Sequence, residues 1–192
     1  MYRHDGLLTR RRQFDAPMTI GVISDTHIHP GSHRELPETV LDLFRRAEVS
    51  LIVHLGDANT RLVLEDLAEI APLIAVSGNN DDVELQDMLP GIVRFTVGKF
   101  RFGAVHGHGG KSAREQVVAR LGGKVDCALF GHSHKPLMEQ HGGTLLFNPG
   151  SATDRRWFEH FGVGLITVEE DRFTPDLVLY ADPSHLVNVQ VS

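Results

Sequence analysis

Six short polar clusters, each next to an apolar run, hold most of the side chains of this chain that could bind a metal or move a proton. Histidine, aspartate and asparagine recur in the clusters, whereas the single cysteine of the sequence lies in an apolar run. Imidazole, carboxylate and amide donors without thiolate suit Mn, Fe, Co, Ni or Zn in a reactive site rather than a closed structural zinc site. The clusters are Asp25-Thr26-His27, Gly56-Asp57, Gly78-Asn79-Asn80-Asp81, His106-Gly107-His108, Gly131-His132-Ser133-His134 and Asn148-Pro149-Gly150-Ser151.

The hydrophobic pattern predicts the elements that position these clusters. From Met18 onward, short β-rich runs alternate with helical stretches, which is typical of βαβ crossovers around a mainly parallel sheet. We expect strands at 20–23, 51–55 and 73–76, and helices at 37–47 and 61–70, the second with Leu62, Leu64, Leu67 and Ile70 facing inward. After Pro90 we expect a hairpin (92–97 and 100–105), a helix (113–121), a strand (125–130), a second hairpin (137–140 and 144–147) and a final meander (162–168 and 172–180).

Convergence of the clusters follows from this arrangement, because ligands of open α/β sheets collect outside the carboxyl ends of the strands. Two cations roughly 3.5–4 Å apart would lower the pKa of a bridging water, so that hydroxide attacks phosphorus in line while the ions hold the phosphoryl oxygens. We assign Asp25, His27 and His134 to one cation, Asn79, His106 and His132 to the other, and Asp57 as the bridging carboxylate.

Size and charge set limits on the class of protein. With 192 residues and 41% hydrophobic content, the chain suits one domain, which we place at 18–180 between a polar, mobile arm at 1–17 and a tail at 181–192. Thr9-Arg10-Arg11-Arg12-Gln13-Phe14 resembles a twin-arginine export signal, but Asp15-Ala16-Pro17 follows where an apolar stretch is needed. A net charge of −6 argues against general nucleic-acid binding, and no run is long enough for a membrane span, so we expect a cytoplasmic protein.

The clusters, in their order and spacing, resemble the calcineurin-like metallophosphoesterase family, and within it the short bacterial and archaeal phosphodiesterases that share a fold with the retromer scaffold subunit. The resemblance runs from about Thr19 to Val168. It implies an α/β fold in which a β-sandwich of two mixed sheets is flanked by helices in four layers, α/β/β/α. It also implies a dinuclear centre, manganese being the first choice, hydrolysis of small phosphate esters, and self-association into homodimers or higher homo-oligomers.

One departure from the family concerns the proton donor to the leaving group. Larger members follow the metal-binding asparagine with a histidine, whereas Asn80 stands at that position here and cannot donate a titrating proton. His108 is our candidate acid and His29 the second, and a good leaving group could depart without help. The missing histidine favours activated or diester substrates over difficult monoesters.

Substrate contacts and supporting residues are less determined by the pattern. We place Asn79 and His108 in the catalytic step, and Asn80, His108 and Arg155 against the substrate, although a solvated turn is the favoured interpretation of Asp154-Arg155-Arg156. His54 either donates to a ligand carboxylate or is simply packed. Asp81 and Asp82 either tether the loop after Asn79 or cap a helix at 83–88, and capping is the use we favour. Specificity is expected to lie in the loops at 30–36 and 109–114.

Two other functions compete with a phosphodiesterase. A non-catalytic interaction scaffold of the same fold is one, although the resemblance implies that scaffolds lose metal-binding histidines and none is missing here. A phosphomonoesterase acting on a small metabolite is the other, and it differs only in substrate.

Overall fold

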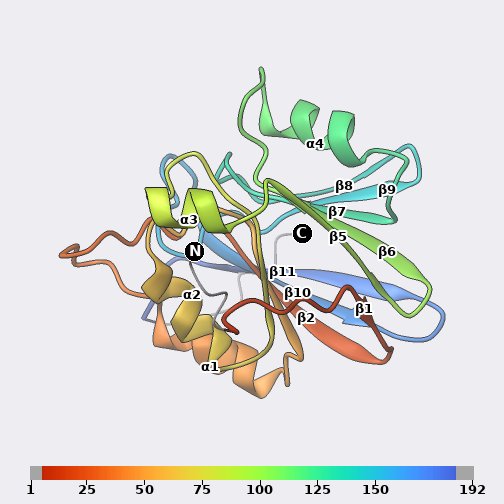
Figure 1. Cartoon of the computed structure of the whole chain (residues 1–192), viewed down its shortest axis with the longest axis horizontal. Coiled ribbons are helices and arrows are strands. Elements are labelled where there is room, and N and C mark those ends of the chain that lie inside the picture. Colours follow the sequence, from red (N-terminus) through yellow and green to blue (C-terminus); the bar gives the residue numbers. More distant parts are fainter. Residues whose placement is uncertain (1–5, 185–192) are drawn as a thin grey trace.

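The computed structural model describes residues 6–184. The first predicted strands and crossovers belong to a five-stranded sheet (Figure 1). Parallel pairing joins the first three strands, and two antiparallel strands extend the sheet, in the order β11-β10-β2-β3-β4. The strands are β2 (Met18–Ile23), β3 (Leu51–His54), β4 (Leu73–Ala75), β10 (Phe161–Val168) and β11 (Phe173–Tyr180).

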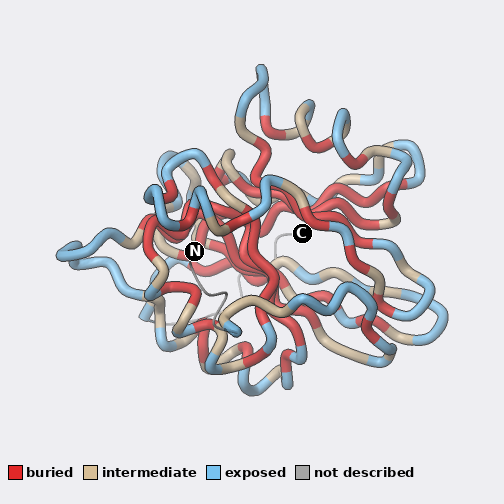
Figure 2. The backbone as a smooth tube through the Cα atoms, in the orientation of Figure 1, coloured by how far each residue is buried: buried red, intermediate tan, exposed pale blue. Residues whose placement is uncertain are grey.

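A six-stranded sheet in the order β1-β5-β6-β7-β9-β8 packs against the first. Its strands are β1 (Gln13–Phe14), β5 (Ile92–Val97), β6 (Phe100–Val105), β7 (Cys127–Phe130), β8 (Leu137–His141) and β9 (Thr144–Asn148). Residues such as Val53 and Ile74 of one sheet meet Phe102 and Phe147 of the other in the central core, and Figure 2 shows that buried segments gather at the centre of the molecule.

Helices cover the outer faces of both sheets. On the five-stranded sheet lie α1 (Glu38–Arg46) and α2 (Arg61–Ala68), and on the six-stranded sheet lies α4 (Ala113–Leu121), with the short α3 (Val83–Met88) leading into β5 (Figure 1). The helices bury one stripe each, because apolar side chains recur at helical spacing. The predicted four-layer α/β/β/α architecture of two mixed sheets is therefore confirmed.

The prediction of a mobile arm over residues 1–17 is wrong for the part that the structure describes. Phe14 is only 8% exposed and belongs to the central core, and β1 pairs in parallel with β5 at the edge of the six-stranded sheet. Further back, the Thr9 backbone N–H donates to the carbonyl of Leu73 on β4, the edge of the other sheet, at 2.9 Å. Residues 6–17 thus run along both sheet edges, while residues 1–5 and most of the predicted tail, 185–192, lie outside the described residues.

Two smaller expectations also need correction. Leu64 and Leu67 are buried as predicted, but Leu62 is 64% exposed, because α2 turns Val63 inward in its place. Asp81 does not cap a helix: its carboxylate accepts the backbone N–H groups of Asn59 and Gly78, whereas Asp82 caps α3. Between residues 6 and 184 no helix has both the length and the apolar character that crossing a bilayer requires.

Candidate metal centre

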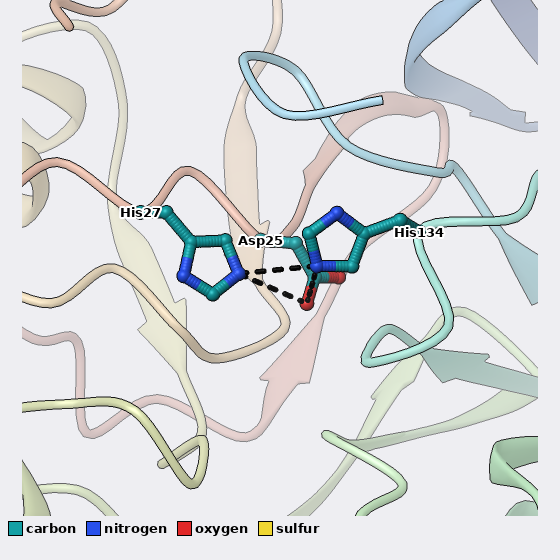
Figure 3. A group of neighbouring side chains, drawn as sticks. All are labelled: Asp25, His27 and His134. Atoms are coloured by element: carbon teal, nitrogen blue, oxygen red, sulfur yellow. Dashed lines mark hydrogen bonds and ion pairs between the residues drawn. The ribbon is translucent and has the colours of Figure 1, made fainter. Parts of the chain in front are cut away.

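Asp25, His27 and His134 form a first buried group of donor atoms (Figure 3). Asp25 and His27 follow β2, and His134 follows β7 across the sandwich. The Nε2 atoms of His27 and His134 are 3.1 Å apart, and Nε2 of His134 is 3.4 Å from Oδ1 of Asp25. Three donors that face one point at this spacing are suited to coordinate one cation.

Asp57, His106 and His132 form a second group of the same composition. They follow β3, β6 and β7, and Nε2 of His106 lies 3.3 Å from Oδ2 of Asp57. The same Oδ2 atom is 3.6 Å from Nε2 of His27, a member of the first group. Asp57 therefore lies between the two groups, and each group takes donors from both sheets.

Hydrogen bonds to the far side of two imidazoles test whether these groups fit a cation. Nδ1 of His106 contacts the Leu55 carbonyl oxygen at 2.7 Å, and Nδ1 of His134 contacts the carbonyl oxygen of Asp154. Because a carbonyl oxygen only accepts, each Nδ1 carries a proton, and each Nε2 atom is the one that points into the site and offers its lone pair when the ring is neutral. Nε2 of His106 is buried without a hydrogen-bond partner among the described residues. A donor atom that is fixed in direction and has no other partner is suited to bind a divalent ion.

The backbone at this site takes the left-handed conformation that residues other than glycine rarely adopt. Among the described residues, eight non-glycine residues have positive φ, and five belong to the two donor groups, with φ from 47° to 68°. Each such residue costs on the order of 1 kcal/mol or more. Strain concentrated in this way indicates that the strand ends are held in a conformation that serves the site. The five are Asp25, His27, Asp57, His132 and His134.

Electrostatics separates the two aspartates. Burial raises the pKa of Asp25 to about 6, despite the opposing effect of His106. Burial by itself would raise the pKa of Asp57 as well. His106 and the two hydrogen bonds donated by Asn80 have a larger, opposite effect, so the pKa of Asp57 lies below its usual range. Burial lowers the pKa of His134 to about 4, so its ring is neutral at pH 7. Asp57 is thus ionised and the His134 ring is neutral, and these are the forms in which the two side chains bind metals.

Neighbouring polar residues hold the donors in place. The Ser151 hydroxyl donates to the backbone carbonyl of Asp25 at 2.7 Å, and the Ser24 hydroxyl donates to the Asp25 carboxylate at 2.6 Å. Asn148 donates to the Gly131 carbonyl at 3.0 Å, just before His132. Through these contacts Asn148 and Ser151 order the chain next to the donor groups.

The predicted catalytic and supporting residues differ in how they contact the two donor groups. Asn79 is exposed and makes no hydrogen bond to any described residue, whereas the Asn80 amide donates to Oδ2 of Asp57 at 2.7 Å. His108 lies beside the second group, with its ring centre 5.5 Å from that of His106 and its Nδ1 buried without a partner among the described residues. His54 is packed: it contacts the Thr26 hydroxyl and the Gly56 N–H rather than a carboxylate.

Arg155 does not face the site. Its guanidinium donates to the Phe158 carbonyl at 2.6 Å and lies over the ring of Phe161. The neighbouring Arg156 lines a cavity beside the first group, together with Arg34. The sequence does not distinguish the two arginines, because the direction of each side chain in a turn depends on its φ and ψ.

Comparisons with known proteins agree with this geometry. The profile of the calcineurin-like phosphoesterase superfamily domain matches residues 18–171. A probable metallophosphoesterase of Methanocaldococcus jannaschii is 37% identical over 139 residues, which are 71% of this chain and 69% of that protein. A phosphodiesterase of the same organism is 27% identical over 145 residues, or 69% of this chain and 83% of that protein.

Solved structures show the same fold. A single mutant of Vps29 from Entamoeba histolytica superposes with a TM-score of 0.72 at 24% identity, covering 87% of this chain and 95% of that one. Likeness at this identity concerns the fold alone, while the profile match covers every donor of both groups. The chain belongs to the calcineurin-like phosphoesterase superfamily, a family of metal-dependent phosphoesterases.

Proposed function

We propose that this protein is a phosphodiesterase with a dinuclear metal centre, and that manganese is the first metal to test. The observation that carries the proposal is the position of Asp57, whose Oδ2 atom faces His106 of one donor group and His27 of the other at 3.3 and 3.6 Å. A carboxylate between two donor groups is suited to bridge two cations. Two ions held there would supply Lewis-acid stabilisation of the phosphoryl oxygens and a water of lowered pKa as nucleophile.

The side chains of the chain itself have distinct roles in this proposal. Asp25, His27 and His134 would hold one ion, His106 and His132 the other, and Asp57 both. Asn79, exposed and without a hydrogen-bond partner among the described residues, can turn its amide oxygen toward the second ion. Asn80 fixes Asp57 through two hydrogen bonds, one donated by its side-chain amide at 2.7 Å and one by its backbone N–H at 2.8 Å, and so orients the bridging carboxylate.

A diester substrate is favoured over a monoester because no histidine follows Asn79 to protonate a poor leaving group. The relative named phosphodiesterase, at 27% identity, supports the same choice. A non-catalytic scaffold is the competing function, which the fold of Vps29 suggests. The complete set of six buried or half-buried donors favours the enzyme, since a scaffold has no need of strained, unpartnered ligands.

Replacement of the bridging carboxylate tests the proposal. Asp57→Asn keeps the shape of the side chain but removes its charge, so we expect Mn²⁺-dependent hydrolysis of bis(p-nitrophenyl) phosphate to fall to background while the far-ultraviolet circular dichroism stays unchanged. Asp126→Asn is the matched control, because Asp126 pairs with Arg101 at 2.7 Å on the surface, away from both donor groups. Wild-type rates in Asp57→Asn, or no metal-dependent rate in the wild type, would contradict the proposal.

A further inference from the structure

A cavity of about 330 Å³ opens beside the first donor group, and His27 forms part of its wall. Its other walls come from the loop between β2 and α1, which projects from the body of the molecule (Figure 1), from the loops that follow β3 and β4, and from the turn that follows β9. The cavity is therefore positioned to receive whatever is attached to a phosphoryl group bound at the donor groups. Its lining includes His29, Arg34, Asn59, Asn80, Asp154 and Arg156.

The arginine and aspartate side chains of this lining leave one net positive charge, although the whole chain has a net charge of −6. Arg34 and Arg156 contribute two guanidinium groups, and Asp154 contributes the one carboxylate of the lining. Arg34 forms an ion pair with Asp154 at 3.1 Å, so these two charges compensate. The Arg156 guanidinium makes no hydrogen bond or ion pair with any described residue, which leaves one uncompensated positive charge in the wall.

The backbone holds Arg156 at the cavity. Arg156 has a φ of 50°, and its backbone N–H contacts Oδ1 of Asp154 at 3.4 Å. The Asp154 carbonyl in turn accepts a hydrogen bond from Nδ1–H of His134. The turn that positions Arg156 therefore also orients His134, a donor of the first group. Arg155, one residue earlier, points instead to Phe158 and Phe161.

A simple phosphodiester has no second anionic group that the Arg156 guanidinium could bind. Its single negative charge lies on the phosphoryl oxygens, and two cations between the donor groups would already compensate it. An unpaired guanidinium farther along the wall gains most from a second anion, because guanidinium binds carboxylate and phosphate through paired, charge-assisted hydrogen bonds. The cavity is therefore built for a group that carries its own negative charge.

We propose that Arg156, supported by Arg34, selects phosphate esters that carry a second anionic group, a carboxylate or another phosphate, on the part of the substrate that occupies this cavity. The inference rests on the proposed function, since it places the reacting phosphoryl group at the two donor groups. It makes Arg156 a specificity-determining residue and the loop at 30–36 part of the substrate-binding wall.

Two phosphonates of equal chain length test the inference: propylphosphonate, with one anionic group, and 3-phosphonopropionate, with an added carboxylate. We expect the Mn²⁺-loaded wild type to bind 3-phosphonopropionate at least about tenfold more tightly by calorimetry, as one charge-assisted hydrogen-bonded pair provides. In Arg156→Gln this preference should fall to about twofold or less, and Arg34→Gln should reduce it as well. Arg155→Gln, the matched control, should keep the wild-type preference.

Equal binding of the two phosphonates by the wild type, no binding of either, or an unchanged preference in Arg156→Gln would overturn the inference. Thermal denaturation of each variant shows whether a lost preference reflects lost folding, and Arg156→Lys, which keeps the charge, should restore part of the preference. Hydrolysis of bis(p-nitrophenyl) phosphate is measured on the same wild-type preparation. Hydrolysis without a preference refutes this inference alone, whereas a preference without hydrolysis refutes the proposed function.

Discussion

At the scale of single residues, neighbouring groups fix the direction of several donors of the candidate metal centre. The Nδ1 atoms of His106 and His134 are bound by backbone carbonyls, so their Nε2 atoms have no freedom of tautomer or direction. Asp57 is held by Asn80 in the same way. Preorganisation of this kind removes the entropic cost of ordering ligands when the ion binds. It also explains why the strain of several left-handed residues is tolerated.

His108 gives a prediction at this scale. Burial, followed by the charge of His106, lowers the pKa of His108, so its ring is mostly neutral at pH 7 and poorly suited to donate a proton. We expect His108→Gln to slow hydrolysis of the p-nitrophenyl and phenyl esters of methyl phosphate by the same factor, below about tenfold. A general acid would instead cost the phenyl ester about 10²–10⁴-fold more. The ratio of the two kcat values decides, and a loss that grows with the leaving-group pKa would restore His108 as the acid.

At the scale of elements, the strand ends can meet only because glycine lets them approach. A Cβ atom on Gly78 would lie 2.1 Å from Oδ1 and 2.3 Å from the backbone nitrogen of Asp57, which are impossible contacts. The turn after β4 is therefore packed directly on the turn after β3. The position of the proposed bridging carboxylate depends on this contact between neighbouring loops.

Gly78→Ala should consequently weaken metal binding. Displacing Asp57 is expected to lower Mn²⁺ affinity by about 10–100-fold, as the loss of a supporting contact typically does. Gly91→Ala is the control, because a Cβ atom at Gly91 meets nothing within 4 Å and its φ is not positive. Isothermal titration of Mn²⁺ into both variants measures the effect, and wild-type affinity in Gly78→Ala would show that Asp57 is not positioned by this contact.

The segment at 6–17 gives the second prediction at this scale. Phe14 is buried in the central core, with its ring centre 6.2 Å from that of Phe95. Phe14→Ala should lower the free energy of unfolding by about 3 kcal/mol. Trp157→Ala, at a side chain that is 96% exposed, should change it by less than about 0.5 kcal/mol. Urea denaturation compares the two, and a negligible effect at Phe14 would support a mobile arm after all.

At the scale of the whole molecule, the two sheets share the site equally. Asp25, His27 and Asp57 follow strands of the five-stranded sheet, and His106, His132 and His134 follow strands of the six-stranded sheet. Each donor group combines both sets, so a cation in either group would link the two layers of the sandwich. Ligand binding and the packing of the sheets are thereby coupled.

Much of this architecture is predictable from the sequence, because its hydrophobic and polar residues recur at regular spacings. Strands, helices and the donors that follow them are marked by hydrophobic period and by polar residues at each strand end. The pairing of β1 was missed because a strand of two residues, Gln13–Phe14, has no period to detect. Leu62 was misplaced because a helix of eight residues with three adjacent apolar positions fits two faces almost equally.

Metal stoichiometry tests the central claim most directly. We expect elemental analysis of the Mn²⁺-loaded protein to give two ions per chain, and anomalous scattering to place one in each donor group with Asp57 between them. Asp57→Asn should lose at least one of the two. A single ion, no ion, or ions bound outside these two groups would contradict the account.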